Sequence, residues 1–120
     1  MKTRPPESTD ADLRRELARL LEAIEADLRR LSYWEAVPPA PERLASEVPF
    51  CHDTLELTQW LQWIFVPRFR ALLDARGPLP AACSIAPVAE LAFGELPEDT
   101  DALLALLSAF DSVIATRRLP

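Results

Sequence analysis

Leucine and isoleucine recur at steps of three and four between residues 13 and 31, and this repeat constrains the fold more than any other feature. The repeating residues are Leu13, Leu17, Leu20, Leu21, Ile24, Leu28 and Leu31. At about 100° per residue, this spacing gathers them into one stripe along an α-helix. We predict a long amphipathic helix that is capped by Ser8, Thr9 or Asp10 and ends near Tyr33 and Trp34.

The opposite face of this helix carries arginines that have carboxylates beside them. The pairs at helical spacing are Asp10–Arg14, Glu25–Arg29 and Asp27–Arg30. Residues three or four apart are neighbours on a helix surface, so these charges pair with one another. The chain has a net charge of −6 and a pI near 4.8, so its electrostatic field repels phosphate backbones. We therefore interpret this face as solvated and self-paired, in preference to a nucleic-acid surface.

A second predicted helix is apolar around most of its circumference. Its apolar residues are Leu57, Trp60, Leu61, Trp63, Ile64, Phe65, Val66, Phe69, Leu72 and Leu73. Asp53 and Glu56 have the spacing of a reciprocal capping box at its start. Gly77 suits the left-handed position after its end, and Pro78 prevents continuation. A helix of this composition is central, with neighbours on several sides.

Pro67 and Arg68 interrupt this apolar helix. In a straight helix Arg68 falls on the side of the core leucines and needs a carboxylate partner, because an unpaired buried charge is costly. The partners that we expect within reach are Asp53, Asp74 and Glu90. Arg68 forms either a structural ion pair or a binding site for an anion or a partner's carboxylate. Pro67 predicts a kink, which would rotate Arg68 away from that face.

Trp60 and Trp63 lie three residues apart, on one flank of the central helix. They either pack beneath the first helix or form an exposed patch for a partner. Stacking on nucleic-acid bases would require a basic groove, which this acidic chain does not indicate. The candidate binding or structural cluster is therefore Asp53, Glu56, Trp60, Trp63, Pro67 and Arg68.

The rest of the chain completes a helical fold. Pro38, Pro39, Pro41 and Pro49 mark a proline-rich linker with one short helical turn, and Pro87 opens a short helix that ends near residues 93–94. Pro97–Thr100 precede a last helix. Twelve prolines against two glycines disfavour a β-rich fold. We predict an all-α bundle of about four helices, with a kinked central helix, as one domain over residues 10–120 behind a flexible tail at 1–9.

Reactive residues are sparse. Cys51, His52 and Asp53 are adjacent, whereas catalytic triads bring their groups together from separated positions. His52 is the only histidine, which argues against zinc, and two glycines do not make a phosphate-binding loop. Cys51 and Cys83 are expected to be reduced. We expect no catalytic, cofactor-binding or metal-binding residues, no membrane span, and a cytoplasmic location.

The stretch "PFCHDTLELTQWLQWIFVPRFRALLD", followed by "GPLP" and "SIAP", resembles the YqcC-like family of small bacterial proteins. The matching residues are Pro49, Phe50, Asp53, Thr54, Glu56, Trp60, Leu61, Gln62, Trp63, Pro67, Arg68, Leu79, Pro80, Ala86 and Pro87, within residues 33–93. The resemblance implies a compact helical cytosolic protein and supplies no activity, cofactor or catalytic residue. It also implies a link to a tRNA pseudouridine synthase through genomic association in some bacteria. Cys51 and His52 are outside its pattern.

Three functions remain open at the level of sequence. The first is a non-enzymatic helical protein that acts through protein–protein contacts or self-association. The second is a small-anion or metabolite binder, or an enzyme without a recognisable signature, that uses a cleft near Arg68, Glu56 and the proline-rich linker. The third is an accessory role in tRNA modification.

Overall fold

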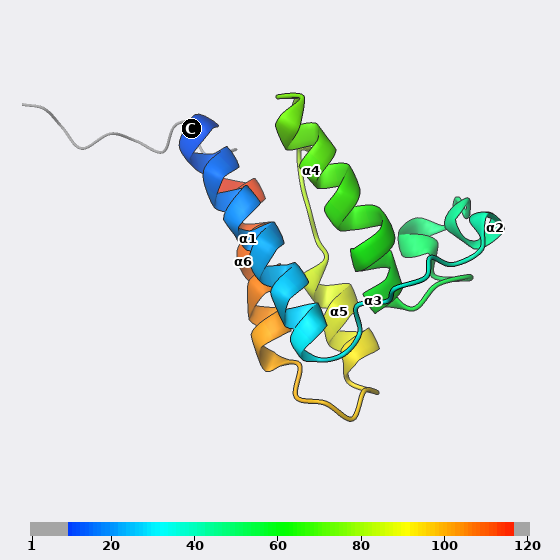
Figure 1. The fold of residues 1–120 in the computed structure, drawn as a ribbon. Helices are drawn as coiled ribbons and strands as arrows, with labels where there is room; N and C mark the ends of the chain where they lie inside the picture. Colours follow the sequence, from blue (N-terminus) through cyan, green and yellow to red (C-terminus); the bar gives the residue numbers. More distant parts are fainter. Residues whose placement is uncertain (1–9, 117–120) are drawn as a thin grey trace, which may run out of the picture.

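Two antiparallel helices lie side by side along the molecule (Figure 1). They are α1 (Asp10–Arg30) and α6 (Asp101–Thr116) in a computed structural model that describes residues 10–116. The predicted stripe of α1 is buried from Leu17 to Leu28, and Leu103, Leu107, Phe110 and Ile114 face it from α6. The flexible tail predicted at residues 1–9 lies outside the described residues. The self-paired face is confirmed, since Arg14, Arg29 and Arg30 each form the expected ion pair.

Helix α1 ends three residues earlier than the prediction near Tyr33. Ser32 takes a left-handed backbone, with φ of 67°. The Ser32 N–H then donates to Arg29 O and the Tyr33 N–H donates to Leu28 O, at 3.0 and 2.9 Å. This is the bonding pattern of a Schellman motif, which satisfies the last helical carbonyls without a glycine.

The central helix consists of α3 (Leu57–Trp60), a π turn η2 (Leu61–Phe65) and α4 (Val66–Asp74), in one continuous run. A π turn holds one residue more than an α turn, which agrees with the kink predicted here. Pro67 then falls in the first turn of α4, where a missing N–H costs little.

The predicted ends of this helix were wrong in detail. The N-cap is Glu56 rather than Asp53, and Gln59 Oε1 accepts from the Glu56 N–H at 2.9 Å. Asp53 instead accepts a hydrogen bond from Ser46 Oγ at 2.6 Å within the linker. At the other end Arg76, not Gly77, is left-handed, with φ of 57°. Gly77 precedes Pro78, which favours an extended backbone there and moves the left-handed residue one position earlier.

The remaining helices are short: α2 (Pro41–Leu44), the 3₁₀ turn η1 (Pro49–Cys51), and α5 (Ala86–Phe93), which packs against α6. Asp111 on α6 holds the start of α5, because its carboxylate accepts from the Ile85 and Ala86 N–H groups at 3.1 and 2.9 Å. Between residues 10 and 116 the chain forms helices and no strand, so the predicted all-α bundle of about four longer helices is confirmed. Within the same range, no helix is long and apolar enough to cross a bilayer.

Candidate functional site: a cleft between the linker and helix α5

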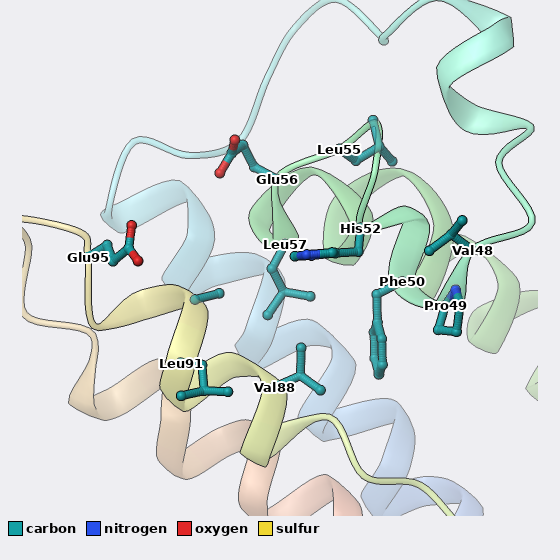
Figure 2. Close-up of a pocket in the computed structure, with 11 residues that line it drawn as sticks. Val48, Pro49, Phe50, His52, Leu55, Glu56, Leu57, Val88, Leu91 and Glu95 are labelled. Atoms are coloured by element: carbon teal, nitrogen blue, oxygen red, sulfur yellow. The ribbon is translucent and has the colours of Figure 1, made fainter.

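A cleft of about 610 Å³ separates the proline-rich linker from α5 (Figure 2). Val48 and Phe50 line the linker side, Val88 and Leu91 line the α5 side, and Leu57 lies between them at the start of α3. Leu91 is 81% exposed and Val48 is 41% exposed. Large apolar side chains with this much exposure, gathered at one concave place, are typical of a binding surface.

The charged groups at the cleft are acidic. Glu56 and Glu95 line it, at the end away from Phe50 (Figure 2). Both residues are exposed, and no lysine or arginine is among the residues that line the cleft. His52, also exposed, contributes the one imidazole. The electrostatic potential of the cleft therefore favours a cationic group over an anionic one.

Phe50 and Cys51 shape the linker side through an unusual backbone. Their φ angles are 60° and 49°, in the left-handed region that bulky residues rarely occupy. The Phe50 ring packs edge-on against Trp60, with the ring centroids 4.8 Å apart. This aromatic contact anchors the strained turn against the central helix, with Phe50 on the cleft and Cys51 buried.

Glu35 ties the beginning of the linker to the same helix. The buried Gln62 amide donates to Glu35 O at 2.7 Å and accepts from the Glu35 N–H at 2.8 Å. Gln59 Nε2 and Trp63 Nε1 donate to the Glu35 carboxylate, at 3.1 and 3.0 Å. We call these four residues the Glu35 clamp. Sequence reasoning did not single out this clamp, although two glutamines on an otherwise apolar helix were its visible sign.

Arg68 does not reach the core, which corrects the prediction for a straight helix. Its side chain is exposed, and no hydrogen bond or ion pair joins it to another of the described residues. The additional residue of the π turn rotates later positions back by about 100°. Phe69 consequently takes the inward position and is 8% exposed. The expected pairing of Arg68 with Asp53, Asp74 or Glu90 is not formed.

The other candidate residues are distributed over three places. Glu56 lines the cleft, whereas Asp53 lies in the linker turn and Pro67 is exposed on α4. Trp60 and Trp63 are both half-buried, and Trp60 also stacks on Phe65 with centroids 5.5 Å apart. The structure therefore places Glu56 at the cleft and leaves Arg68 outside it.

The reactive side chains of the described residues are separated from one another. Cys51 is buried while its neighbour His52 is exposed, as expected for adjacent side chains that diverge. Burial, together with a hydrogen bond to Asp111, raises the pKa of the Cys83 thiol to about 12. Among residues 10–116, no three histidine, cysteine or acidic side chains are grouped as a metal site. What this arrangement offers is an apolar, acidic surface for binding.

Comparison with known proteins assigns the class. The sequence profile of the DUF446 family, which is described as "tRNA pseudouridine synthase C", matches residues 16–113. The chain belongs to this family, and the YqcC-like resemblance is thereby confirmed. YqcC of Escherichia coli K12, an uncharacterized protein, is 39% identical over 95 residues, which are 79% of this chain and 87% of YqcC.

Other relatives give the fold and one named enzyme. The solution NMR structure of E. coli YqcC superimposes with a TM-score of 0.77 at 35% identity, covering 90% of this chain and 92% of that one. An uncharacterized protein of Haemophilus influenzae Rd is 36% identical over 96 residues, or 80% of this chain and 91% of the relative. The tRNA pseudouridine synthase C of Pectobacterium carotovorum is 47% identical over 57 residues, which are 48% of this chain and 15% of the synthase.

Proposed function

We propose that this chain is a non-catalytic accessory protein that binds an enzyme of tRNA pseudouridylation. The observation that carries the proposal is the 57-residue stretch, 47% identical, that it shares with a tRNA pseudouridine synthase C. That stretch is only 15% of the synthase, so most of that enzyme lies outside the similarity. A segment attached to an enzyme in one chain and separate in another suggests that the two parts work in contact. Covalent linkage raises the effective concentration of such a contact.

The cleft supports a protein partner in preference to RNA or a small anion. Its apolar lining and exposed Leu91 suit the buried centre of a protein interface. Its acidic side chains and the net charge of −6 oppose phosphate. Arg68, the candidate cation for an anion site, does not line the cleft. The uncharacterized relatives of E. coli and H. influenzae neither add to this proposal nor oppose it.

The experiment is a direct titration of the purified chain with the tRNA pseudouridine synthase C of the same organism. We expect a defined complex by size-exclusion chromatography with light scattering, with a Kd of about 10 µM or tighter by calorimetry. We expect no pseudouridine from the chain incubated with tRNA in the absence of the synthase. Separate elution together with no heat of binding at about 100 µM would refute the proposal.

A further inference from the structure

We propose that the cleft between the linker and α5 is a docking groove for one segment of a protein partner, in which an apolar anchor stands beside a lysine or arginine. This inference rests on the proposed function for the existence of a protein partner and adds where and by what chemistry the partner binds. The alternatives, an apolar segment without a cation and a second copy of this chain, become outcomes of the test.

The apolar requirement comes from the exposed side chains of both walls. Leu91 projects from α5 with 81% of its surface exposed, and Val88 lies on the same side of the cleft. Val48 and Phe50 face them from the linker, with Leu57 between. A volume of about 610 Å³ is enough to receive several apolar side chains. An apolar anchor in a concave, desolvated place is the usual centre of a protein interface.

The basic requirement comes from the charges. Glu56 and Glu95 line one end of the cleft without a lysine or arginine among the lining residues. No hydrogen bond or ion pair joins the Glu95 carboxylate to another of residues 10–116. An acidic segment would be repelled, whereas a lysine or arginine at this end would be attracted and oriented. Binding should therefore weaken as the salt concentration rises.

The groove is already held open by contacts outside it. The Glu35 clamp fixes the beginning of the linker, and Asp111 fixes the start of α5 through two backbone N–H groups. Trp60 packs edge-on against the Phe50 ring. Because neither wall needs to be ordered on binding, little of the binding free energy is lost to reorganisation.

The test uses two cleft variants, each with a matched control. Leu91→Lys places a charge on the exposed apolar wall, and Val37→Lys makes the same change at a 75% exposed valine outside the cleft. Glu95→Lys reverses one charge at the cleft, and Glu90→Lys makes the same reversal at an exposed position of α5 that does not line it. All four positions are exposed, so thermal unfolding should confirm an intact fold.

The probe is a displayed library of random 12-residue peptides, selected on the full wild-type chain. We expect enrichment of peptides that combine apolar residues with lysine or arginine. Their affinity should fall at least tenfold for Leu91→Lys and Glu95→Lys and stay within about twofold for the two controls. Replacing the peptide's cation by glutamate should abolish binding.

Failure of the groove and failure of the proposed function give different results. Three results would overturn the docking groove, even if the synthase binds. The first is that the enriched peptides bind the cleft variants as tightly as the wild type. The others are enrichment of apolar peptides without a cation, and no enrichment at all. Selection of the expected peptides by a chain that does not bind the synthase would refute the proposed function and leave the groove. A dimer in solution that Leu91→Lys dissociates would assign the groove to a second copy and overturn the proposal.

Discussion

Four residues between Asp10 and Thr116 have a left-handed backbone, and none of them is glycine. Ser32 and Arg76 terminate helices, while Phe50 and Cys51 form the turn beside the cleft. Glycine adopts this conformation without the steric cost that a Cβ imposes. Glycine should therefore relieve the backbone strain at the two helix ends. At position 50 it would also remove the side chain that contacts Trp60 and lines the cleft.

Replacing Arg76 by glycine should stabilise the protein. Arg76 is exposed and has φ of 57°, so Arg76→Gly removes strain without removing a buried contact. We expect the free energy of unfolding in urea to rise by about 0.5–1 kcal/mol. The control, Arg68→Gly, lies at an exposed position inside α4 and should lower it by a similar amount. Equal losses in both variants would contradict the left-handed assignment.

Cys83 should react slowly with alkylating agents in the folded protein. The thiolate is the reactive form, and burial together with Asp111 raises the pKa of Cys83 to about 12. At pH 8 the alkylation rate of Cys83 in the folded protein should therefore be lower, by a factor of about ten or more, than in guanidinium. Its rate should keep rising with pH well above pH 9. Both rates are measured by treating the protein with iodoacetamide, with and without guanidinium, and following the Cys83 peptide by mass spectrometry after digestion.

Asp111→Asn provides the control for this prediction. It removes the negative charge beside Cys83, which should lower the pKa of the thiol and speed its alkylation in protein that is still folded. Rates that rise and level off near pH 9 in the wild type would show that the thiol is not perturbed.

At the scale of elements, one additional residue in the central helix determines which side chains meet the core. The π turn at Leu61–Phe65 makes Phe69 an inward residue and Arg68 an outward one. Phe69 then packs against Phe65 and Phe110, with centroids 5.8 and 4.8 Å apart. The periodicity of the sequence does not reveal such an insertion, because apolar residues surround most of this helix.

Pro67→Ala should change stability little. In the interior of a straight α-helix, removing a proline would stabilise the protein by about 3 kcal/mol. Pro67 instead lies in the first turn of α4 after the π turn, so we expect a change within about 1 kcal/mol in urea unfolding. Ala71→Pro, at an exposed position further along α4, is the matched control and should cost about 3 kcal/mol or more. A large gain from Pro67→Ala would argue against the π turn.

Gln62→Ala should release the start of the linker. Its buried amide satisfies both backbone groups of Glu35, which would lose these partners. We expect a loss of about 2 kcal/mol and faster hydrogen exchange at the Glu35 amide. Gln59→Ala leaves those two bonds in place. It should therefore change hydrogen exchange at the Glu35 amide little and cost about 1 kcal/mol or less. Unchanged exchange at Glu35 in Gln62→Ala would disprove the clamp.

At the scale of the molecule, the larger of two apolar clusters joins α1, the central helix, α5 and α6, while Cys51, Leu55 and Ile64 form a smaller one. Phe110 of α6 is fully buried and packs edge-on against Phe65 and Phe69, with centroids 5.0 and 4.8 Å apart. Leu61 and Leu17 belong to the same buried cluster. A shared core of this kind predicts cooperative unfolding of the whole described bundle.

Phe110→Ala should destabilise this bundle as a unit. Removing a large buried ring leaves a cavity that the surrounding helices fill only in part, so we expect a loss of about 3–5 kcal/mol. Urea unfolding followed by circular dichroism and by tryptophan fluorescence should give coincident single transitions at lower urea. Leu91→Ala, at an exposed position, should stay within about 0.5 kcal/mol. Separate transitions by the two probes would contradict a shared core.

The sequence by itself determined the helices and most of the exposed ion pairs along α1. The leucine repeat of α1, its neighbouring charges and Pro87 at the start of α5 are local features, because each depends on residues within about one helical turn. Glu56 was identified near the linker for the same reason, through a capping pattern that is correct in kind but begins three residues later than predicted.

Only the tertiary structure decided which residues share a site. The outward turn of Arg68 follows from a π turn, and the clamp on Glu35 joins positions 27 residues apart. The cleft brings the linker and α5 together across the central helix, so no short pattern contains both Val48 and Leu91. Local periodicity records which face of a helix is apolar, whereas the contacts between faces depend on the packing of the whole chain.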